Sequence, residues 1–488
     1  MLFNSYVFIL GFLPVMLAVY FAAGRLRRAG PRNAIAALGL GSLVFYGWWD
    51  ARYLALLCGS MAFNYCAGRA LMRMGTGEAA SHRRRTLTLA VTVNLLLLGA
   101  FKYADFFASS VNAVSTAQLP LLHLALPLGI SFFTFTQIAF LVDASRGRVN
   151  SLSPINYLLF VSFFPHLIAG PILHHREMMP QFDRPDAAHA NADHLAEGLF
   201  LFCLGLVKKV LIADQFAPLA TAGFAAVDIL DTPAAWLTSV AYTLQLYFDF
   251  SGYTDMALGL GLMFNIRLPQ NFNSPYRATS IQDFWRRWHM TLSRFLRDYL
   301  YIPLGGDRHG RLATARNVFV TFVLGGLWHG AGWTFVVWGA LHGAALVVQR
   351  AWNWRGWHMP AWLGWMLTLL FVNFAWVYFR APSLAHANGL VQRMLGVAGP
   401  HSATMGLTGL TQEAARLGQG LFGSQSAPVW LVLGLTAAAA VVVCTAPNSI
   451  RLARDFRPGK RSAAACGLAL AASLLVMHRP TEFLYFNF

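Results

Sequence analysis

Long apolar runs separated by short polar segments recur along the whole chain. A transmembrane helix needs about 20 consecutive apolar residues. Runs of that length, or somewhat shorter or longer, lie at about 2–23, 34–49, 53–71, 87–104, 119–142, 153–171, 196–213, 234–264, 315–330, 332–349, 361–379, 428–446 and 463–477. The pattern therefore predicts an all-α polytopic membrane protein.

Composition and charge agree with this prediction. Of the 488 residues, 57% are hydrophobic and 12% are charged, whereas a soluble domain is about 25% charged. The net charge of +17 comes largely from arginines in the short loops, which is typical of cytoplasmic loops of membrane proteins. We therefore expect contact with a lipid bilayer and no binding of nucleic acid.

The arginines also predict an orientation. Two clusters lie on either side of the second and third apolar runs: Arg25, Arg27, Arg28 and Arg32, and then Arg73, Arg83, Arg84 and Arg85. Both clusters should face the cytoplasm, which places the N-terminus outside. The first run lacks a basic n-region and a small-residue cleavage site, so we interpret it as an uncleaved span.

The stretch "IQDFWRRWHMTLSRFLRDYLYIPLGG" (281–306) predicts an amphipathic helix over 281–299. Its apolar residues recur at helical spacing and are Ile281, Trp285, Trp288, Leu292, Phe295 and Tyr299. The other sides carry four arginines, among them Arg286, which suits a helix lying at the membrane interface. Alternatively, the arginines bind an anionic cytosolic ligand, because guanidinium matches phosphate bidentately. His289 lies at the edge of the apolar stripe, where its side chain can point into the protein.

The stretch "GGLWHGAGWTFVVWGALHG" (325–343) belongs to a pair of apolar runs that together hold 35 residues, 315–349. Two full spans need roughly 40 residues plus a turn, so we expect a short or tilted hairpin whose turn, 329–332, lies within the bilayer. His329 would then be an ionisable group at membrane depth, which marks a candidate functional site. A hydrogen-bonded structural histidine is the alternative. Because no Ser or Cys adjoins His329, a general base that activates a group of another molecule suits it best.

Seven ordered stretches resemble a known family. They are "PLGISFFTFTQIAFLVD" (127–143), "FFPHLIAGPI" (163–172), "KKVLIADQFAPL" (208–219), "YFDFSGYTDMALGLGLMF" (247–264), "NFNSPYRATSIQDFWRRWHMTLSRFLRDYLYIPLGG" (271–306), "GLWHGAGWTFVVWGALHG" (326–343) and "TEFLYFNF" (481–488). Together they are similar to the bacterial membrane-bound O-acyltransferases (MBOAT), of the alginate O-acetyltransferase type. The resemblance is weak in 1–120 and 380–480.

The resemblance implies a fold and a site. The fold is a ring of about 10–13 transmembrane helices around a central funnel, with interfacial and re-entrant helices. It divides the chain into N-terminal helices (1–120), a catalytic core (121–380), and an extramembrane loop with C-terminal helices (381–488). The family's catalytic histidine matches His329, and its second functional position matches His289. Candidate substrate-binding residues are Trp285, Arg286, Trp288, Trp328 and His342, of which His342 supports the site.

The resemblance also implies a reaction. The donor would be cytosolic acetyl-CoA, with no permanently bound cofactor and no metal. The acceptor would be an exported polysaccharide such as an alginate-like polymer, cellulose or peptidoglycan, reached directly or through a periplasmic SGNH-like acetyltransferase partner. The location would be the bacterial inner membrane.

Two other functions compete with this one. Within the family, the alternative is D-alanyl transfer to teichoic acid. Outside it, a transporter would use Asp249 and Asp255, two carboxylates in an apolar run, as ion sites. No inverted repeat supports a transporter, so we favour structural roles for both carboxylates, as partners of helix-end arginines or of backbone near Gly252. Other polar residues that can shape the funnel are His166, Asn271 and Asn273.

Overall fold

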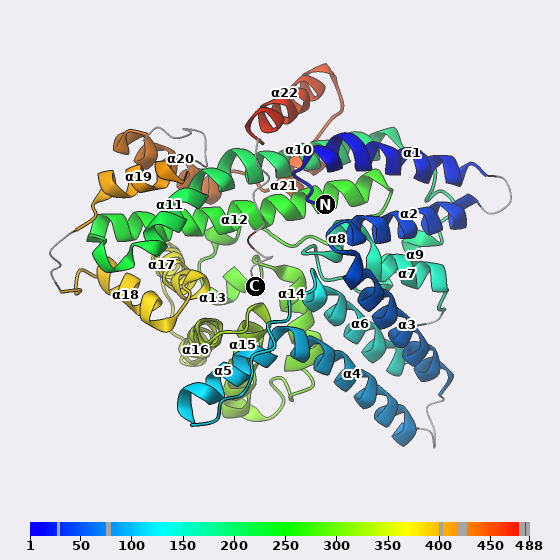
Figure 1. Ribbon diagram of the computed structural model, residues 1–488, viewed down its shortest axis with the longest axis horizontal. Helices are drawn as coiled ribbons and strands as arrows, with labels where there is room; N and C mark the ends of the chain where they lie inside the picture. The colour runs from blue at the N-terminus through cyan, green and yellow to red at the C-terminus, as the bar shows by residue number, and fades with distance from the viewer. Residues whose placement is uncertain are drawn as a thin grey trace. The chain divides into compact units, whose positions relative to one another are not determined.

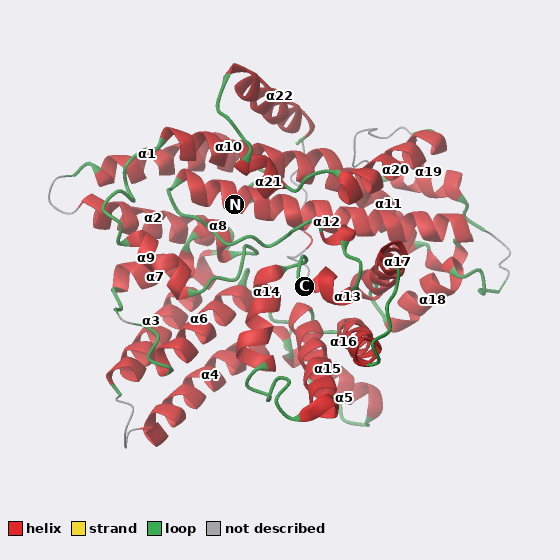
Figure 2. Cartoon of the chain, turned by 180° about the vertical axis from the view of Figure 1, so that it is seen from behind, coloured by secondary structure: helices red, strands yellow, loops and turns green. Residues whose placement is uncertain are grey.

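The computed structural model describes residues 1–26, 30–74, 80–149, 151–399, 404–417, 427–477 and 484 (Figure 1). Within these residues the regular structure is helical, and the extended structure is limited to an isolated bridge between Leu230 and Met405. Figure 2 shows the same arrangement from behind, with the helices in red. The all-α class predicted from the sequence is confirmed.

The chain forms two compact units. The first comprises Met1–Cys203, Tyr253–Pro269 and Phe456–Cys466, and the second comprises Leu204–Gly252, Gln270–Asp455 and Gly467–Phe488. These units describe packing. The functional division into 1–120, 121–380 and 381–488 stays a prediction.

Most helices belong to one unit. The first unit contains η1 (Val7–Phe12, π-helical), α1 (Leu13–Gly24), α2 (Gly30–Gly47), α3 (Ala51–Arg73), α4 (Ala80–Lys102), α5 (Ala104–Val114), α6 (Ile130–Ser145), α7 (Pro154–Ser162), α8 (Phe164–Leu167), α9 (His175–Phe182) and most of α10 (Ala192–Leu206). The second contains η2 (Val207–Ala213, π-helical), α11 (Asp214–Ala225), η3 (Val227–Ile229), η4 (Pro275–Arg277), α13 (Ile281–Trp285), α14 (Met290–Leu296), η5 (Arg297–Tyr301, π-helical), α15 (Gly310–His329), α16 (Trp333–Trp354), α17 (Ala361–Arg380), α18 (Leu384–Met394), α19 (Leu407–Arg416), α20 (Val429–Thr445) and α21 (Ser449–Arg454). Residues of α12 (Thr232–Met263) and α22 (Lys460–Val476) contribute to both.

Several of these helices suit a membrane. Among the described residues, Val7–Gly24, Ala80–Lys102 and Ala361–Arg380 are long and apolar enough to cross one, and Ile130–Ser145 and Val429–Thr445 are shorter apolar helices. The predicted runs coincide with helices along most of the chain. The orientation predicted from the arginine clusters rests partly on Arg27 and Arg28, which lie outside the described residues.

Three predicted segments differ from the structure. The run at 119–142 is helical only from Ile130, because Pro120 and Pro127 interrupt its first part. The run at 153–171 breaks between α7 and α8 at Phe163, two residues before Pro165. The extramembrane loop expected at the start of 381–488 contains α18 and α19, and residues 400–403 and 418–426 lie outside the described part.

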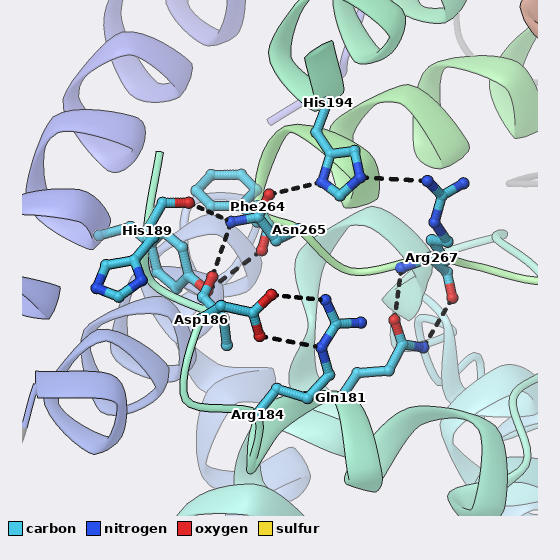
Figure 3. Close-up of polar contacts among 10 residues, drawn as sticks. Gln181, Arg184, Asp186, His189, His194, Phe264, Asn265 and Arg267 are labelled. Atoms are coloured by element: carbon cyan, nitrogen blue, oxygen red, sulfur yellow. Dashed lines mark hydrogen bonds and ion pairs between the residues drawn. The ribbon is translucent and has the colours of Figure 1, made fainter. Parts of the chain in front are cut away.

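In the first unit, a polar network holds the loop between α9 and α10 against the end of α12 (Figure 3). Asn265 has a left-handed backbone with φ of 60°, and its Nδ2 donates to the carbonyl oxygens of Ala187 and His189 at 2.9 and 2.7 Å. The Nδ1 of His194 lies 2.8 Å from Asn265 Oδ1, and Arg267 reaches the other ring nitrogen of His194 at 3.2 Å. The network thereby ties α10 to α12.

The same loop carries an exposed ion pair (Figure 3). The Nη2 of Arg184 lies 3.3 Å from Oδ2 of Asp186. Hydrogen bonds from the Arg184 guanidinium hold the pKa of the Asp186 carboxyl below its usual range. Because both side chains are exposed, the pair orders the loop more than it stabilises the fold.

In the second unit, α15 and α16 form a tightly packed hairpin. A Cβ at Gly326 would lie against the carbonyl oxygen of Phe335 and 2.9 Å from Cα of Gly339, so only glycine permits this approach. The hairpin was expected to be short or tilted; it is not short, and its tilt stays a prediction. The helices have 20 and 22 residues because each extends beyond the apolar run, and α15 alone is about 30 Å long at 1.5 Å per residue. The depth of the turn stays a prediction.

Candidate active site

His329 is the last residue of α15, immediately before the turn. It is 4% exposed, and three aromatic rings surround its imidazole. The ring centroids of Trp328, Trp338 and Phe379 lie 4.9, 5.0 and 5.2 Å from that of His329. Trp338 is itself stacked on Trp376 at 5.7 Å. The fold therefore places the imidazole in a rigid, apolar cage.

The predicted single helix over 281–299 is wrong, because the chain breaks at His289. The segment consists of α13, a turn, α14 and the π-helical η5. His289 adopts φ of 42°, a left-handed conformation that is uncommon for a residue other than glycine. The neighbouring segment stabilises the break, since Asn271 O accepts the N–H of Met290 at 3.0 Å and Asn273 N–H donates to Arg287 O at 2.9 Å.

The apolar stripe of this segment packs against protein, and its position relative to the membrane interface stays a prediction. Its apolar residues face protein and not lipid, since the members Ile281, Trp285, Trp288, Leu292 and Phe295 are all buried. Trp288 stacks on Phe284 at 5.7 Å and contacts Trp376 at 5.0 Å. The apolar stripe predicted from the sequence is therefore buried in a protein core, which periodicity does not distinguish from contact with lipid.

The structure brings the two predicted catalytic histidines together. The imidazole of His289 is fully buried, and its centroid lies 6.3 Å from that of His329. Trp328 lies 6.3 Å and Phe250 of α12 4.9 Å from His289. Residues 40 positions apart in the sequence thus share one apolar pocket in the second unit.

A cavity of about 220 Å³ opens beside this pocket. Its polar lining includes Gln282, Arg286, Arg297, Tyr301, Gln349 and Arg350, and its apolar lining includes Trp285, Leu296, Val318, Phe322 and Leu346. Trp285 lies 5.8 Å from Trp338, the ring that packs against His329. One end of the cavity wall therefore touches the cage of His329, while arginines line the cavity.

The other predicted substrate-binding residues have different surroundings in the structure. Trp285 and Arg286 line the cavity, and Trp328 contacts both histidines. Trp288 packs on other aromatic rings and is not part of the cavity lining. His342 is fully buried, and its Nδ1 accepts a hydrogen bond from the Trp285 indole at 3.2 Å. Its ring also packs on Trp338 at 4.8 Å, so it supports two walls of the site.

Near the site, a buried lysine is paired with two carboxylates. Lys209 Nζ lies 2.6 Å from Asp249 Oδ1 and 2.8 Å from Asp214 Oδ1. Asp249 Oδ2 accepts the backbone N–H of Leu484 at 3.1 Å, the one described residue of the terminal "TEFLYFNF" stretch. The expected partner of Asp249, a helix-end arginine or backbone near Gly252, is corrected to these groups. Gly252 has another role: a Cβ at this position would lie 2.8 Å from the Gly205 carbonyl oxygen and 3.1 Å from the Lys209 backbone nitrogen, so its absence permits the close packing of α12 on this segment.

Sequence reasoning missed part of the site. Phe250, Trp338, Trp376 and Phe379 were not singled out, because an aromatic residue in an apolar run carries no signal of its own. Lys209 lies in one matched stretch and Asp249 in another, and a lysine and an aspartate in two apolar runs are a recognisable signal of a buried pair. Of the polar residues that were expected to shape the funnel, Asn271 contacts His289, because its Oδ1 lies 3.2 Å from Nδ1 of the imidazole. His166 lies in the first unit, where its side chain bonds to the Phe160 carbonyl oxygen.

The fold and the site together define a class: a helical membrane protein with a buried histidine pair beside an arginine-lined cavity. The profile of MBOAT, the membrane-bound O-acyltransferase family, matches residues 80–387. The chain belongs to this family and is an acyltransferase, which excludes a transporter without acyl chemistry as its class.

Curated relatives agree. The chain is 47% identical over 447 residues to the peptidoglycan O-acetyltransferase of Helicobacter pylori, covering 85% of this chain and 82% of that protein. It is 45% identical over 402 residues to the "probable alginate O-acetylase AlgI" of Pseudomonas aeruginosa, covering 81% and 75%. The teichoic acid D-alanyltransferase of Bacillus subtilis is 29% identical over 275 residues, covering 53% of this chain and 70% of that protein.

Proposed function

We propose that the protein transfers acetyl groups from cytosolic acetyl-CoA to an exported polysaccharide, with peptidoglycan, an alginate-like polymer and cellulose as candidate acceptors. It would lie in a bacterial inner membrane with its N-terminus in the periplasm, and would act directly or through a periplasmic SGNH-like partner. The observation that carries the proposal is the pairing of His289 with His329 next to an arginine-lined cavity. D-alanyl transfer is the weaker candidate, since those relatives are less similar and cover less of the chain.

The residues suggest a division of labour. The cavity would hold the donor, with Arg286 and Arg350 near the phosphates of CoA and the thioester directed along Trp285 towards Trp338. His329 would act as the general base that takes the proton of the acceptor hydroxyl or thiol. The hydroxyl oxygen or thiol sulfur then bonds to the acetyl carbonyl carbon, the carbon–sulfur bond to CoA breaks, and the CoA thiolate takes up a proton. Dry, aromatic surroundings limit hydrolysis of the thioester by water.

Membrane vesicles of opposite sidedness test this function. Inside-out and right-side-out vesicles are prepared from cells that produce the protein and its polymer, and radiolabelled acetyl-CoA is added outside. We expect label in the polymer only with inside-out vesicles, because only these expose the cytoplasmic face to the added donor. Equal labelling in both preparations, or none in either with intact protein present, would contradict the proposal.

The cavity arginines should control donor affinity. Arg286 and Arg350 line the cavity, and neither makes an ion pair with a carboxylate among the described residues. Arg286→Ala and Arg350→Ala should each raise KM for acetyl-CoA about 5–10-fold, about 1–1.4 kcal/mol, with kcat nearly unchanged, because a binding contact to remote phosphates is equal in the ground and transition states. Steady-state kinetics in inside-out vesicles measure this.

Arg311→Ala is the matched control. Arg311 packs over the Trp354 ring at 5.5 Å and does not line the cavity, so its removal should leave KM within about twofold. Equal KM values for all three variants and wild type would place the donor elsewhere.

A further inference from the structure

The N-terminus of α14 is capped by a residue from a distant segment. The N-cap position belongs to His289, whose own side chain makes no capping hydrogen bond. Instead, Asn271 Oδ1 accepts the backbone N–H of Thr291 at 3.2 Å and the Thr291 hydroxyl at 2.9 Å. Asn271 thus satisfies one of the open donors of the first helical turn, which a Ser, Thr, Asp or Asn at the N-cap normally does.

The cap fixes which way the Asn271 amide faces. A backbone N–H can only donate, so the atom facing Thr291 N must be the amide oxygen and not the NH2 group. The same oxygen lies 3.2 Å from Nδ1 of His289. Two acceptors cannot bond to each other, so Nδ1 of His289 must carry the hydrogen, and in the neutral ring the lone pair is then on Nε2.

We propose that Asn271 is a positioning residue that holds His289 in the Nδ1–H tautomer and presents the basic Nε2 nitrogen inside the pocket shared with His329. This inference rests on the proposed function, in which the two histidines form the reaction site. Asn271 acts through His289 and needs no contact with substrate.

An amide suits this role better than the other capping residues. A carboxylate would cap α14 and accept from Nδ1 equally well, but its charge would favour the imidazolium form of His289. A hydroxyl can rotate to donate or accept, so it would not select a tautomer. Asn271 is fully buried, and its Nδ2 has no partner among the described residues. A residue chosen only to cap a helix would not need that buried NH2 group.

The groups around His289 determine how strongly a charge at position 271 would change the protonation of His289. Around His289, the described residues place one titratable ring, His329 of α15, together with the uncharged Phe250 of α12 and Trp328 of α15. Asp249, which precedes Phe250 on α12, is paired with Lys209. A carboxylate at position 271 would replace an amide oxygen that lies 3.2 Å from Nδ1, so it would act on His289 directly.

The test compares Asn271→Asp, Asn271→Leu and the control Thr291→Val in the inside-out vesicle assay, with kcat/KM measured against pH. In Asn271→Asp the carboxylate favours protonated His289, so the loss of activity at low pH should begin about one pH unit or more higher than in wild type, with KM for acetyl-CoA unchanged. Asn271→Leu should lose about 10–100-fold at every pH. Thr291→Val keeps the backbone N–H and should reproduce the wild-type profile.

A spectroscopic measurement covers the case in which the variants do not fold. Solid-state NMR of the wild-type protein with ¹⁵N-histidine, assigned with His289→Gln, should show Nδ1 of His289 protonated. An Nε2–H tautomer would overturn the inference, as would an Asn271→Asp pH profile that superimposes on the wild type. If either result is found while His329→Ala is inactive, the inference about Asn271 fails and the proposed function stands. If His329→Ala is fully active, the inference and the proposed function both fail.

Discussion

Replacing His329 by glutamine or alanine is expected to lower kcat for acetyl transfer by about 10²–10⁴-fold, the range for loss of a general base. Neither side chain can accept the proton of the acceptor at neutral pH. The cage of Trp328, Trp338 and Phe379 also limits the entry of water as a substitute base. Because the lost interaction belongs to the transition state, KM for acetyl-CoA should change little.

The measurement is the rate of label transfer in inside-out vesicles, normalised to folded protein from size-exclusion chromatography. His166→Gln is the matched control, because His166 is also buried and its Nε2 bonds to the Phe160 carbonyl in the first unit. It should transfer acetyl at close to the wild-type rate per folded molecule. Activity of His329→Gln within a few-fold of wild type would remove His329 from the chemistry.

The same assay assigns His289. A variant His289→Ala with lower kcat and unchanged donor KM would place its Nε2 in the reaction. A higher donor KM with unchanged kcat would make it a donor-binding residue. Unchanged values of both would return it to a structural role, the role that its left-handed backbone and its contact with Asn271 already give it.

The sequence predicted the class of fold because membrane helices leave a strong local signal. Apolar runs of spanning length gave most of the helices, and the matched stretches gave the family. The breaks were harder to predict. The stripe at 281–299 has unbroken helical spacing, and the chain is interrupted at His289 by pairing with residues 271–273. That pairing is a tertiary contact, which periodicity does not contain.

The residues of the candidate site were also predictable only where a local motif marks them. His329 and His289 were predicted because they lie in distinctive motifs, and their adjacency came only from the structure. The cage around His329 combines residues of α15, α16 and α17, each ordinary in its own run. The hairpin length was mispredicted because helices continue into polar sequence, where hydropathy no longer marks their ends.

Removing the charge of Lys209 is expected to destabilise the second unit strongly. Lys209 and Asp249 have side chains that are 4% and 1% exposed, and Lys209→Met would leave two carboxylates facing each other without a cation. Breaking a buried pair from one side costs about 3–5 kcal/mol, so the melting temperature in detergent should fall by several degrees. The adjacent Lys208→Met is the control, since Lys208 bonds to the neutral hydroxyl of Ser449 at 2.6 Å, and it should melt close to wild type.

A double variant separates the pair from general damage. Lys209→Met with Asp249→Asn removes opposite charges together, so it should melt between Lys209→Met and wild type, with a coupling energy of about 1–3 kcal/mol in the cycle. Additive losses would mean that the two groups do not stabilise each other. Because Asp249 precedes Phe250, whose ring packs on His289 at 4.9 Å, a restored melting temperature should be accompanied by restored acetyl transfer. The buried ion pair then contributes to catalysis by fixing the part of α12 that forms one wall of the histidine pocket.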